Sequence, residues 1–576
     1  MRAIFKFRVR VVLMVVVGIA VLIAGRLYVV QVVHGTRYSE RAKQQFSAAG
    51  QSGLFDRGSI YFTTKDGTHV SAATLATGYL VAINPRLLAD PTAAYDAISA
   101  VATTTLSKSA FLAAAANKNL VYVEVAHELS TAAGQRLAAE NITGVEVLPE
   151  RWRWYPGGSL ATKTIGVVGY GTGSTLIGQS GLEEEYDPVL ERSGGDLLGN
   201  FFAMLFSGAG STLVSAQGAR EGDVVTTIEP EVESRLMDDV AAMNAKHSSH
   251  SSGGIIMDPK TGAIIALATY PTYNPNNLSN VNPQLLENPL VSHVYEFGSI
   301  MKAVTMASGL SSGAISATST YDDTGCFHVD GDRICNWNYH AYGVIPMKVI
   351  IMQSLNLGAS WIAEQLGHTR MRDYFTKLFG TKTGIDLPNE ATALLGNLSK
   401  PQQIYYDTAS FGEGVAVTPI EMIRAEAAIA NGGVLVTPHV VSSIVSQSGQ
   451  TKELTWASGT RVFTRQATRE TASMMNDLFS QVLYNGKYNI PGIPVSMKTG
   501  TAQLPTPTGT YYNNRFFDDE VVFFPSYNPR FIILLYTEDP KNAIYGTDTI
   551  TPPMIDLIHF LINYYGITPA MAGTAS

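Results

Sequence analysis

Residues 298–310 read GSIMKAVTMASGL, a Ser-x-x-Lys pattern followed by a run of helix-forming residues. A helix that begins here brings Ser299 and Lys302 to one face, because side chains three residues apart are neighbours on a helix. A serine hydroxyl attacks well only when a base removes its proton, and a lysine serves as that base when a lowered pKa leaves it neutral. The backbone N–H of a serine at a helix N-terminus also stabilises an oxyanion. The stretch predicts an activated nucleophile, although a lone Ser-x-x-Lys recurs by chance in long chains.

Two further motifs follow Ser299 in the chain. Ser354-Leu355-Asn356 is a Ser-x-Asn sequence, and Lys498-Thr499-Gly500 lies within VSMKTGTAQ, which is typical of a strand. The three motifs occur in this order in penicillin-binding proteins and class A β-lactamases, so the set is far more specific than any one of them. On a strand, Lys498 would lie beside the nucleophile, and Gly500 would let a substrate backbone approach closely. A second Lys-Thr-Gly, at 260–262, lies upstream in DPKTGA and is typical of a turn.

Strands are predicted on both sides of a helix-rich middle that runs from 299 to 433. GGIIMD and AIIALAT flank the turn Pro259–Gly262 and predict a hairpin, while VSMKTGTAQ, EVVFFP and FIILLYTED predict three strands near the C-terminus. Before the hairpin, a helix is predicted whose apolar face carries Val232, Leu236, Val240 and Met243. This order predicts an α+β fold with a sheet built from the two ends of the domain.

The composition sets outer limits on fold and function. The 576 residues are 45% hydrophobic and 15% charged, which predicts two or more folded domains and excludes a largely disordered chain. The net charge is −8, and no basic patch with interleaved aromatic residues occurs. Nucleic acid is therefore not an expected partner.

The N-terminus predicts a membrane anchor. Four basic residues within positions 1–10 precede the uncharged stretch 11–25, and apolar residues continue beyond it. A helix over 9–30 is long enough to cross the ~30 Å hydrocarbon layer, and the positive charges keep the N-terminus in the cytoplasm. A cleaved signal peptide is the alternative, and it too would export the rest of the chain. The later apolar run FFAMLF, 201–206, is too short to span.

The only two cysteines, Cys326 and Cys335, flank the sequence FHVDGDRI. Asp330-Gly331 at its centre is favoured in two-residue hairpin turns, and counting outward from the turn places Cys326 opposite Cys335. An oxidising compartment favours a disulfide between them. The alternative is a metal site formed by both cysteines with His328 and His340, although this spacing matches no usual zinc pattern.

Beyond these motifs, the chain resembles the class B penicillin-binding proteins over most of its length. The likeness is carried by RLYVVQVVHGTRYSERAKQQ, RWRWYPGGSLATKTIG, GQSGLEEEYDPVL, MDPKTGAIIALATYPTYNPN, YEFGSIMK, CFHVDGDRICNWNYHAYG, FGEGVAVTPIEM and KTGTAQ. Phe297 occupies a position where the family usually has proline. RGSIYFTTKDG has Phe62 and Thr63 where Asp-Arg is usual, and Arg192 replaces a usual glycine.

The resemblance implies an N-terminal transmembrane helix, an elongated mixed α/β pedestal, and a C-terminal transpeptidase domain of the serine β-lactamase-like type. In that domain, an antiparallel sheet is flanked by helices. The predicted segments are a cytoplasmic tail (1–8), the membrane helix (9–30), a linker (31–52), a dimerisation-type pedestal (53–222), the transpeptidase domain (223–568) and a tail (569–576).

The resemblance also implies a role for each motif residue. Ser299 would attack the carbonyl between two D-alanines of a peptidoglycan stem peptide, and Lys302 would accept its proton. Ser354 and Lys498 would help carry a proton to the departing D-alanine, and either lysine remains a candidate for the base. Asn356 would hold Lys302 and the substrate amide, and Thr499 would bind the terminal carboxylate. The backbone N–H groups of Ser299 and Thr501 would form the oxyanion hole.

The same resemblance implies a setting for the reaction. The expected location is the bacterial cytoplasmic membrane, with a single span and the catalytic domain outside. The expected partners are stem peptides, β-lactams that trap Ser299, a membrane-embedded glycan polymerase and other cell-wall synthesis proteins. No cofactor or metal is expected. SLNLG and FFPSYNPRFIILLYTEDP favour a septal over an elongation type.

Three other functions have some support in the sequence. A β-lactamase shares the three motifs, but no Glu-x-x-Leu-Asn for deacylation lies between Ser354 and Lys498. A penicillin sensor would require a cytoplasmic signalling domain. A non-catalytic division scaffold would have lost the nucleophile. An α/β-hydrolase would use the Gly-x-Ser-x-Gly at 309–313, but a helix is predicted before that serine where a nucleophile elbow requires a strand.

Overall fold

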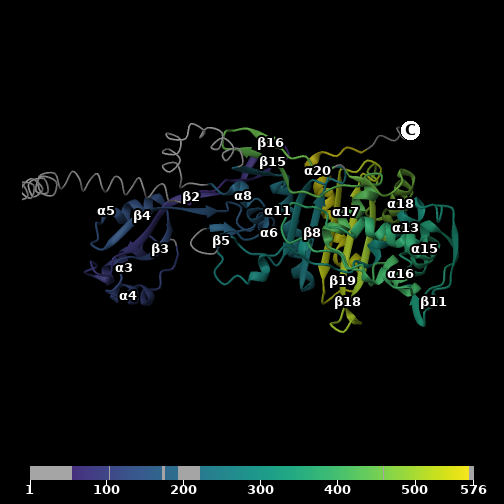
Figure 1. Cartoon of the computed structure of the whole chain (residues 1–576). Coiled ribbons are helices and arrows are strands. Elements are labelled where there is room, and N and C mark those ends of the chain that lie inside the picture. Colours follow the sequence, from purple (N-terminus) through teal and green to yellow (C-terminus); the bar gives the residue numbers. More distant parts are fainter. Residues whose placement is uncertain (1–54, 103, 172–175, 193–220, 458, 570–576) are drawn as a thin grey trace, which may run out of the picture. The chain divides into compact units, whose positions relative to one another are not determined.

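The computed structural model describes residues 55–102, 104–171, 176–192, 221–457 and 459–569 (Figure 1). The predicted membrane helix 9–30, the linker 31–52 and the apolar run 201–206 lie outside these residues. Within the described ranges, no helix combines the length and the apolar character needed to cross a bilayer.

The chain forms two compact units whose boundaries differ from the predicted division at 222/223. One contains Leu75–Trp152, and the other contains Arg57–Thr74, Arg153–Arg192 and the described chain from Glu221 onward. Two segments of the predicted pedestal are therefore part of the larger unit, where Ile60 lies opposite Val224 on a neighbouring strand and Arg153 pairs with Glu183.

The smaller unit packs three helices against three paired strands. The second half of β2 (His69–Ile83) pairs with β3 (Val123–Leu129) and with β4 (Val145–Trp154). The helices are α3 (Pro91–Ser99), α4 (Lys108–Ala116) and α5 (Thr131–Ala139), and each begins at an N-cap oxygen, from Asp90, Ser107 and Ser130 respectively. Its core contains Val81, Ile83, Ile98, Phe111, Leu129 and Leu137.

The larger unit is built around a five-stranded antiparallel sheet in the order β18-β19-β20-β8-β9. The strands are β8 (Ser251–Met257), β9 (Ile264–Tyr270), β18 (Ser496–Pro505), β19 (Tyr511–Phe524) and β20 (Phe531–Glu538). The first two and the last three come from opposite ends of the unit, so the predicted α+β arrangement is confirmed.

Helices cover both faces of this sheet, as Figure 1 shows for α11 (Pro230–His247) and α17 (Pro419–Ala430) on either side of β8. On one face, α11 and α20 (Thr551–Tyr565) enclose an apolar core. The four residues predicted on the apolar face of α11 are all buried there. On the other face, α13 (Met301–Ser311), α15 (Asn356–Phe379) and α17 contribute to a second core.

Shorter elements complete the larger unit. A small sheet joins β16 (Thr451–Glu453), β15 (Val441–Ser446), β7 (Gly222–Thr226), β1 (Ile60–Thr63) and the start of β2. Further helices are α6 (Thr162–Ile165), α7 (Gly181–Glu185), α8 (Asp187–Leu190), α12 (Pro289–Ser292), α14 (Met347–Gln353), α16 (Gln403–Ser410), α18 (Arg465–Asp477) and α19 (Gly546–Thr549). Paired short strands are β5 (Val168–Tyr170) with β6 (Leu176–Gly178), β10 (Thr320–Asp323) with β13 (Gly343–Pro346), β11 (Cys326–Val329) with β12 (Asp332–Cys335), and β14 (Val434–Leu435) with β17 (Thr460–Arg461).

A buried ion-pair network joins three of the segments that carry the family resemblance. Arg57 Nε and Arg153 Nε each donate to one carboxylate oxygen of Glu183, both at 2.6 Å, and Arg57 also pairs with Asp187 at 2.7 Å. The side chains of both arginines and of Glu183 are at most 2% exposed. Removing one member of such a network leaves a buried charge without its partner, which typically costs about 3–5 kcal/mol.

The departures from the family pattern have local structural roles. Phe62 is buried in the core of the larger unit, and the Thr63 hydroxyl donates to the Thr226 carbonyl at 2.6 Å. Arg192 pairs with Asp223 at 2.8 Å.

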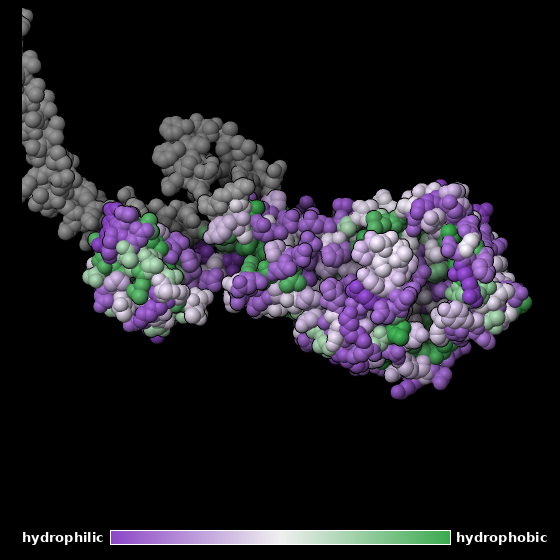
Figure 2. All heavy atoms as spheres, turned by 90° about the horizontal axis from the view of Figure 1, so that it is seen from below, coloured by the Kyte–Doolittle hydropathy of each residue, from purple (hydrophilic) through white to green (hydrophobic). Residues whose placement is uncertain are grey.

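The surface seen in Figure 2 is mostly hydrophilic, and its apolar residues gather in separate patches.

Candidate active site

Ser299 lies in a short 3₁₀ turn, Gly298–Ile300, that leads directly into α13. Gly298 has a φ of 58°, and a Cβ at this position would lie 2.9 Å from the Thr501 carbonyl oxygen. Glycine therefore allows the turn to adopt a left-handed conformation against β18. The result is a half-buried serine at the start of a helix, beside the Lys-Thr-Gly strand.

Lys302 connects the first two motifs. Its ammonium nitrogen lies 2.8 Å from Ser299 Oγ, 2.8 Å from the Ser354 carbonyl oxygen and 3.2 Å from Ser354 Oγ. The side chain is buried, and burial, followed by the nearby Lys498 ammonium, holds its pKa well below the ordinary value for lysine. A neutral amine at this position can accept the proton of Ser299.

Ser354 connects the two lysines. It ends α14 with a φ of 53°, a left-handed conformation that is uncommon for a residue other than glycine. Lys498 Nζ lies 3.0 Å from Ser354 Oγ and 2.8 Å from the Thr499 carbonyl oxygen. Burial lowers the pKa of Lys498 to about 8, although neighbouring carboxyls act in the opposite direction. The three motifs thus form one continuous chain of hydrogen bonds from Ser299 to Lys498.

Asn356 and the residues after Lys498 are also placed at this site. The Asn356 amide donates to the Cys335 carbonyl at 3.0 Å, a partner different from the Lys302 contact that the resemblance implies. Thr499 and Thr501 are half-buried on β18, and the Gly546 N–H donates to Thr501 Oγ1 at 3.2 Å. These contacts join the Ser-x-Asn motif to the end of β12 and the Lys-Thr-Gly strand to the start of α19.

Glycine at 500 also has a reason within the protein itself, in addition to the expected approach of a substrate backbone. A Cβ at Gly500 would lie 2.0 Å from Asp519 Oδ1, on the adjacent strand β19. The space that a side chain would fill is therefore occupied by a buried carboxyl of the protein itself.

The cysteine hairpin supports the second motif. β11 and β12 pair with Cys326 opposite Cys335 and His328 opposite Arg333, which is the predicted register, and the structure joins the two sulfurs in a disulfide. Trp337, just after the hairpin, donates through Nε1 to the Gln353 carbonyl at 3.2 Å, next to Ser354. Among the described residues, no group of three or more His, Cys, Asp or Glu side chains is arranged to hold a metal ion.

These residues line a cleft of about 730 Å³ in the larger unit. Its floor contains Ser299, Ser354, Asn356 and Lys498–Thr501, and its rim contains Trp337, Tyr339, Tyr484, Ile544 and Tyr545. The Trp337 and Tyr545 rings meet edge to face with centroids 6.1 Å apart. The cleft can admit a peptide-sized ligand and offers it aromatic contacts above a polar floor.

Glu413 is a site residue that was not identified from the sequence. It lines the cleft, burial raises its pKa to about 7, and its charge acts on Lys302. It lies in FGEGVAVTPIEM, a segment quoted only for its family likeness. A lone glutamate in a Gly-rich turn carries no spacing signal that would link it to Ser299.

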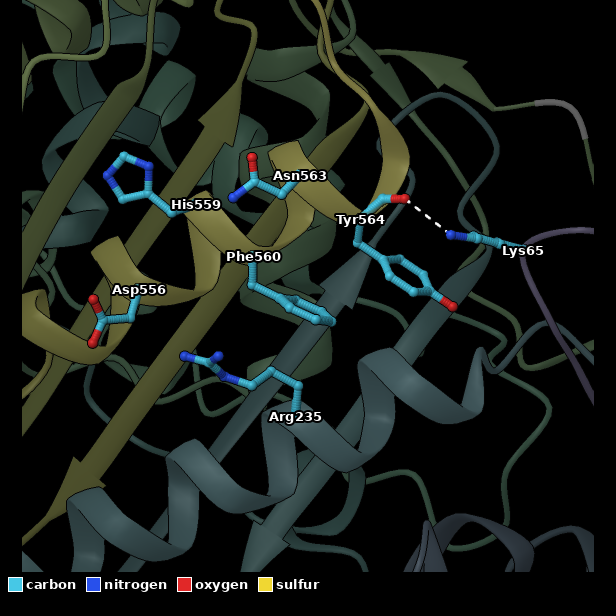
Figure 3. A pocket seen from close by; sticks show the side chains of 7 residues that line it. All are labelled: Lys65, Arg235, Asp556, His559, Phe560, Asn563 and Tyr564. Atoms are coloured by element: carbon cyan, nitrogen blue, oxygen red, sulfur yellow. Dashed lines mark hydrogen bonds between the residues drawn. The ribbon is translucent and has the colours of Figure 1, made fainter.

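A second hollow of about 720 Å³ shares no residue with the cleft. Figure 3 shows Phe560 of α20 between Arg235 and Tyr564, with Lys65 bonded to the Tyr564 carbonyl at 3.3 Å. The Arg235 guanidinium pairs with Asp239 at 2.8 Å and lies 5.4 Å over the Phe560 ring. No serine, threonine or cysteine is among the residues that line this hollow, so the candidate active site is the cleft. The Gly-x-Ser-x-Gly at 309–313 falls at the end of α13, where no strand precedes it.

Comparison with known proteins gives consistent matches. Residues 253–556 match the family described as "Penicillin binding protein transpeptidase domain". Stage V sporulation protein D of Bacillus subtilis (strain 168) is 26% identical over 439 residues, which cover 74% of this chain and 66% of that protein. The peptidoglycan D,D-transpeptidase FtsI homolog of Mesostigma viride is 26% identical over 491 residues, 79% of each chain. The crystal structure of penicillin-binding protein 3 from Mycobacterium tuberculosis with aztreonam aligns with a TM-score of 0.67 at 20% identity, covering 90% of this chain and 98% of that one.

Proposed function

Because the chain belongs to the class B penicillin-binding proteins, we propose that it is a serine D,D-transpeptidase that cross-links peptidoglycan stem peptides through an acyl-enzyme on Ser299. One observation carries the proposal. The buried Lys302 amine lies 2.8 Å from Ser299 Oγ, at the floor of a cleft large enough for a peptide. This is the geometry of a nucleophile with its base.

In the first step, Ser299 Oγ attacks the carbonyl of the penultimate D-alanine while its proton passes to the Lys302 amine. The oxyanion accepts hydrogen bonds from the backbone N–H groups of Ser299 and Thr501. The C–N bond then breaks, and the terminal D-alanine leaves with a proton delivered through Ser354, whose Oγ lies within 3.2 Å of Lys302 and 3.0 Å of Lys498. Thr499 and the Lys498 ammonium hold the terminal carboxylate.

In the second step, an amine from a neighbouring stem peptide attacks the ester at Ser299. The amine loses a proton through the same hydrogen-bonded chain, Ser299 regains its own, and a new amide links the two peptides. A β-lactam follows the first step alone, since its ring opens without releasing a leaving group, and it remains on Ser299.

The reaction takes place outside the cytoplasmic membrane, with the chain anchored by residues 9–30 and working beside a membrane-embedded glycan polymerase. Septal cell-wall synthesis is proposed on the likeness of SLNLG and FFPSYNPRFIILLYTEDP to the septal type. A fluorescent fusion to the full chain should gather at division sites in growing cells. A signal confined to the side wall would overturn the septal role and leave the transpeptidase proposal intact.

The enzymatic proposal is tested by labelling the full-length chain in membranes with a fluorescent penicillin. The wild type should form one stable adduct, and peptide mass spectrometry should place it on Ser299. Ser299→Ala should abolish the label, whereas Ser311→Ala, at the far end of α13, should keep it. A label that disappears within seconds would indicate a β-lactamase, and no label at all would indicate a scaffold.

A further inference from the structure

Four carboxyl groups are fully buried behind the Lys-Thr-Gly strand. Three are consecutive on β19, Asp518, Asp519 and Glu520, and the fourth, Glu426, lies on α17; each has 0% exposure. Acidic side chains are almost never fully buried unless they are paired. None of the four forms an ion pair within 4.0 Å among the described residues. The burial of four carboxyl groups without an ion pair therefore indicates that they have a function.

Strand register divides these carboxyls between the two faces of the sheet. Residues directly opposite on antiparallel strands point to the same side, and here Lys498 is opposite Val521 while Gly500 is opposite Asp519. Since positions 498 and 500 share a face, Asp519 shares it as well. Asp518 and Glu520 point to the opposite face, where they accept hydrogen bonds from Thr549 and Thr551 at 2.9 and 2.6 Å.

Glu426 lies on the helix that covers the same face, and its charge acts on Lys498. α17 packs against β19 and β20, and its buried apolar residues belong to the same core as Val521 and Phe517. Both oxygens of Glu426 and both oxygens of Asp519 have no hydrogen-bond partner among the described residues. The Lys498 ammonium is the cation that acts on each of them.

We propose that Asp519, on the adjacent strand, and Glu426, on the covering helix, are positioning residues for Lys498, which keep its ammonium charged and directed at Ser354. Gly500 is part of this arrangement, because its missing side chain leaves the space that the Asp519 carboxyl fills. The inference rests on the proposed function, in which a charged Lys498 holds the substrate carboxylate and takes part in proton transfer.

The charges around Lys498 determine the direction of the effect. The groups that act on it are Asp519, Glu426 and Glu520, while Lys302 lies beyond Ser354. Burial raises the pKa of Glu426 to about 8 and that of Asp519 well above its ordinary value, while burial lowers that of Lys498 to about 8. Groups this close titrate as a set. Within the set, an ionised carboxyl favours the charged lysine, so replacing it by an amide makes Lys498 lose its proton at lower pH.

The test is the pH profile of acylation. The second-order rate constant for benzylpenicillin is measured on the full-length protein between about pH 6 and pH 10, across the range where a perturbed lysine titrates. Asp519→Asn and Glu426→Gln should each move the alkaline limb to lower pH by about one unit, and the double variant should move it further. Glu426→Asp, which keeps the carboxyl, should stay near the wild type.

Glu421→Gln is the matched control. Glu421 is a fully buried carboxyl on the same helix whose pKa burial raises to about 7, and it acts in the capping box with Thr418, a role that glutamine also fulfils. The alkaline limb of the Glu421→Gln profile should coincide with that of the wild type. If the alkaline limbs of Asp519→Asn and Glu426→Gln coincide with that of the wild type, and both variants still carry the label on Ser299, the inference is overturned. The proposed function would stand in that case. A wild type that never forms the Ser299 adduct would instead overturn the proposed function, and the inference with it.

Discussion

The larger unit buries positive charge in two places, and it does so in opposite ways. In the network of Arg57, Arg153 and Glu183, both guanidinium groups lie 2.6 Å from a carboxylate oxygen. In the cleft, Lys302 and Lys498 donate to serine and backbone oxygens, and neither forms an ion pair within 4.0 Å among the described residues. The first arrangement keeps the arginines charged. The second lowers the pKa of each lysine, so that its charged form is less favoured.

The choice of side chain matches this difference. Arginine stays protonated in proteins, and its planar group binds a carboxylate in fixed geometry, so it suits a permanent joint between chain segments. Lysine loses its proton readily when buried, and Lys302 shows this, because burial and the Lys498 charge both lower its pKa. Buried charge therefore stabilises the fold in one region and, in the proposed mechanism, takes part in the chemistry in the other.

The largest effect is expected for Lys302→Met. A methionine of similar length cannot accept the Ser299 proton, so the acylation rate by benzylpenicillin should fall about 10²–10⁴-fold. The unfolding temperature should stay the same or rise, because a buried amine is replaced by an apolar group. Stopped-flow labelling and thermal unfolding check the two parts. A large loss of stability would mean that Lys302 is a structural cation like Arg57.

Glu183→Gln should have the converse effect. It leaves Arg57 and Arg153 buried with a neutral partner, and the free energy of unfolding should fall by about 3–5 kcal/mol. The folded fraction should still acylate at the wild-type rate. Denaturant unfolding gives the stability, and active-site titration corrects the rate for unfolded protein. A slower rate per folded molecule would show that the network and the cleft are coupled.

Gly500→Ala should cost about 1–3 kcal/mol of stability, because its Cβ would lie 2.0 Å from Asp519 Oδ1. The strand must then shift, so acylation should slow as well. In the Gly500→Ala/Asp519→Ala double variant the clash is removed, and most of the lost stability should return. If the double variant is no more stable than Gly500→Ala alone, the clash with Asp519 is not the reason for glycine at this position.

The smallest effect is expected for Glu413→Gln. The Glu413 carboxylate favours the charged form of Lys302, so its removal should let Lys302 stay neutral to lower pH. The acid limb of the acylation profile should therefore move to lower pH, by less than about one unit, since the carboxyl is itself partly neutral near its pKa of about 7. A shift to higher pH would contradict this assignment of charge. Glu421→Gln again provides the control.

The sequence by itself was enough to predict the segments that meet at the candidate site and much of the architecture. Ser-x-x-Lys predicts a shared face through helix geometry alone, and Asp330-Gly331 predicts the hairpin register through turn chemistry. The sheet built from two ends followed from the order of strands and helices. These features are local, because a few neighbouring residues determine them whatever surrounds them.

Only the tertiary structure revealed the environment of those segments. Asp518, Asp519 and Glu520 are three consecutive acids, a residue type that is seldom fully buried, yet all three are buried in the middle of a sheet. The grouping of Arg57–Thr74 and Arg153–Arg192 with the catalytic unit was likewise absent from the predicted boundary. Burial and charge proximity depend on segments that are remote along the chain, and they decide which lysine is neutral. For that reason the sequence predicts the candidate reacting residues, and the fold determines the surroundings that shift their pKa values.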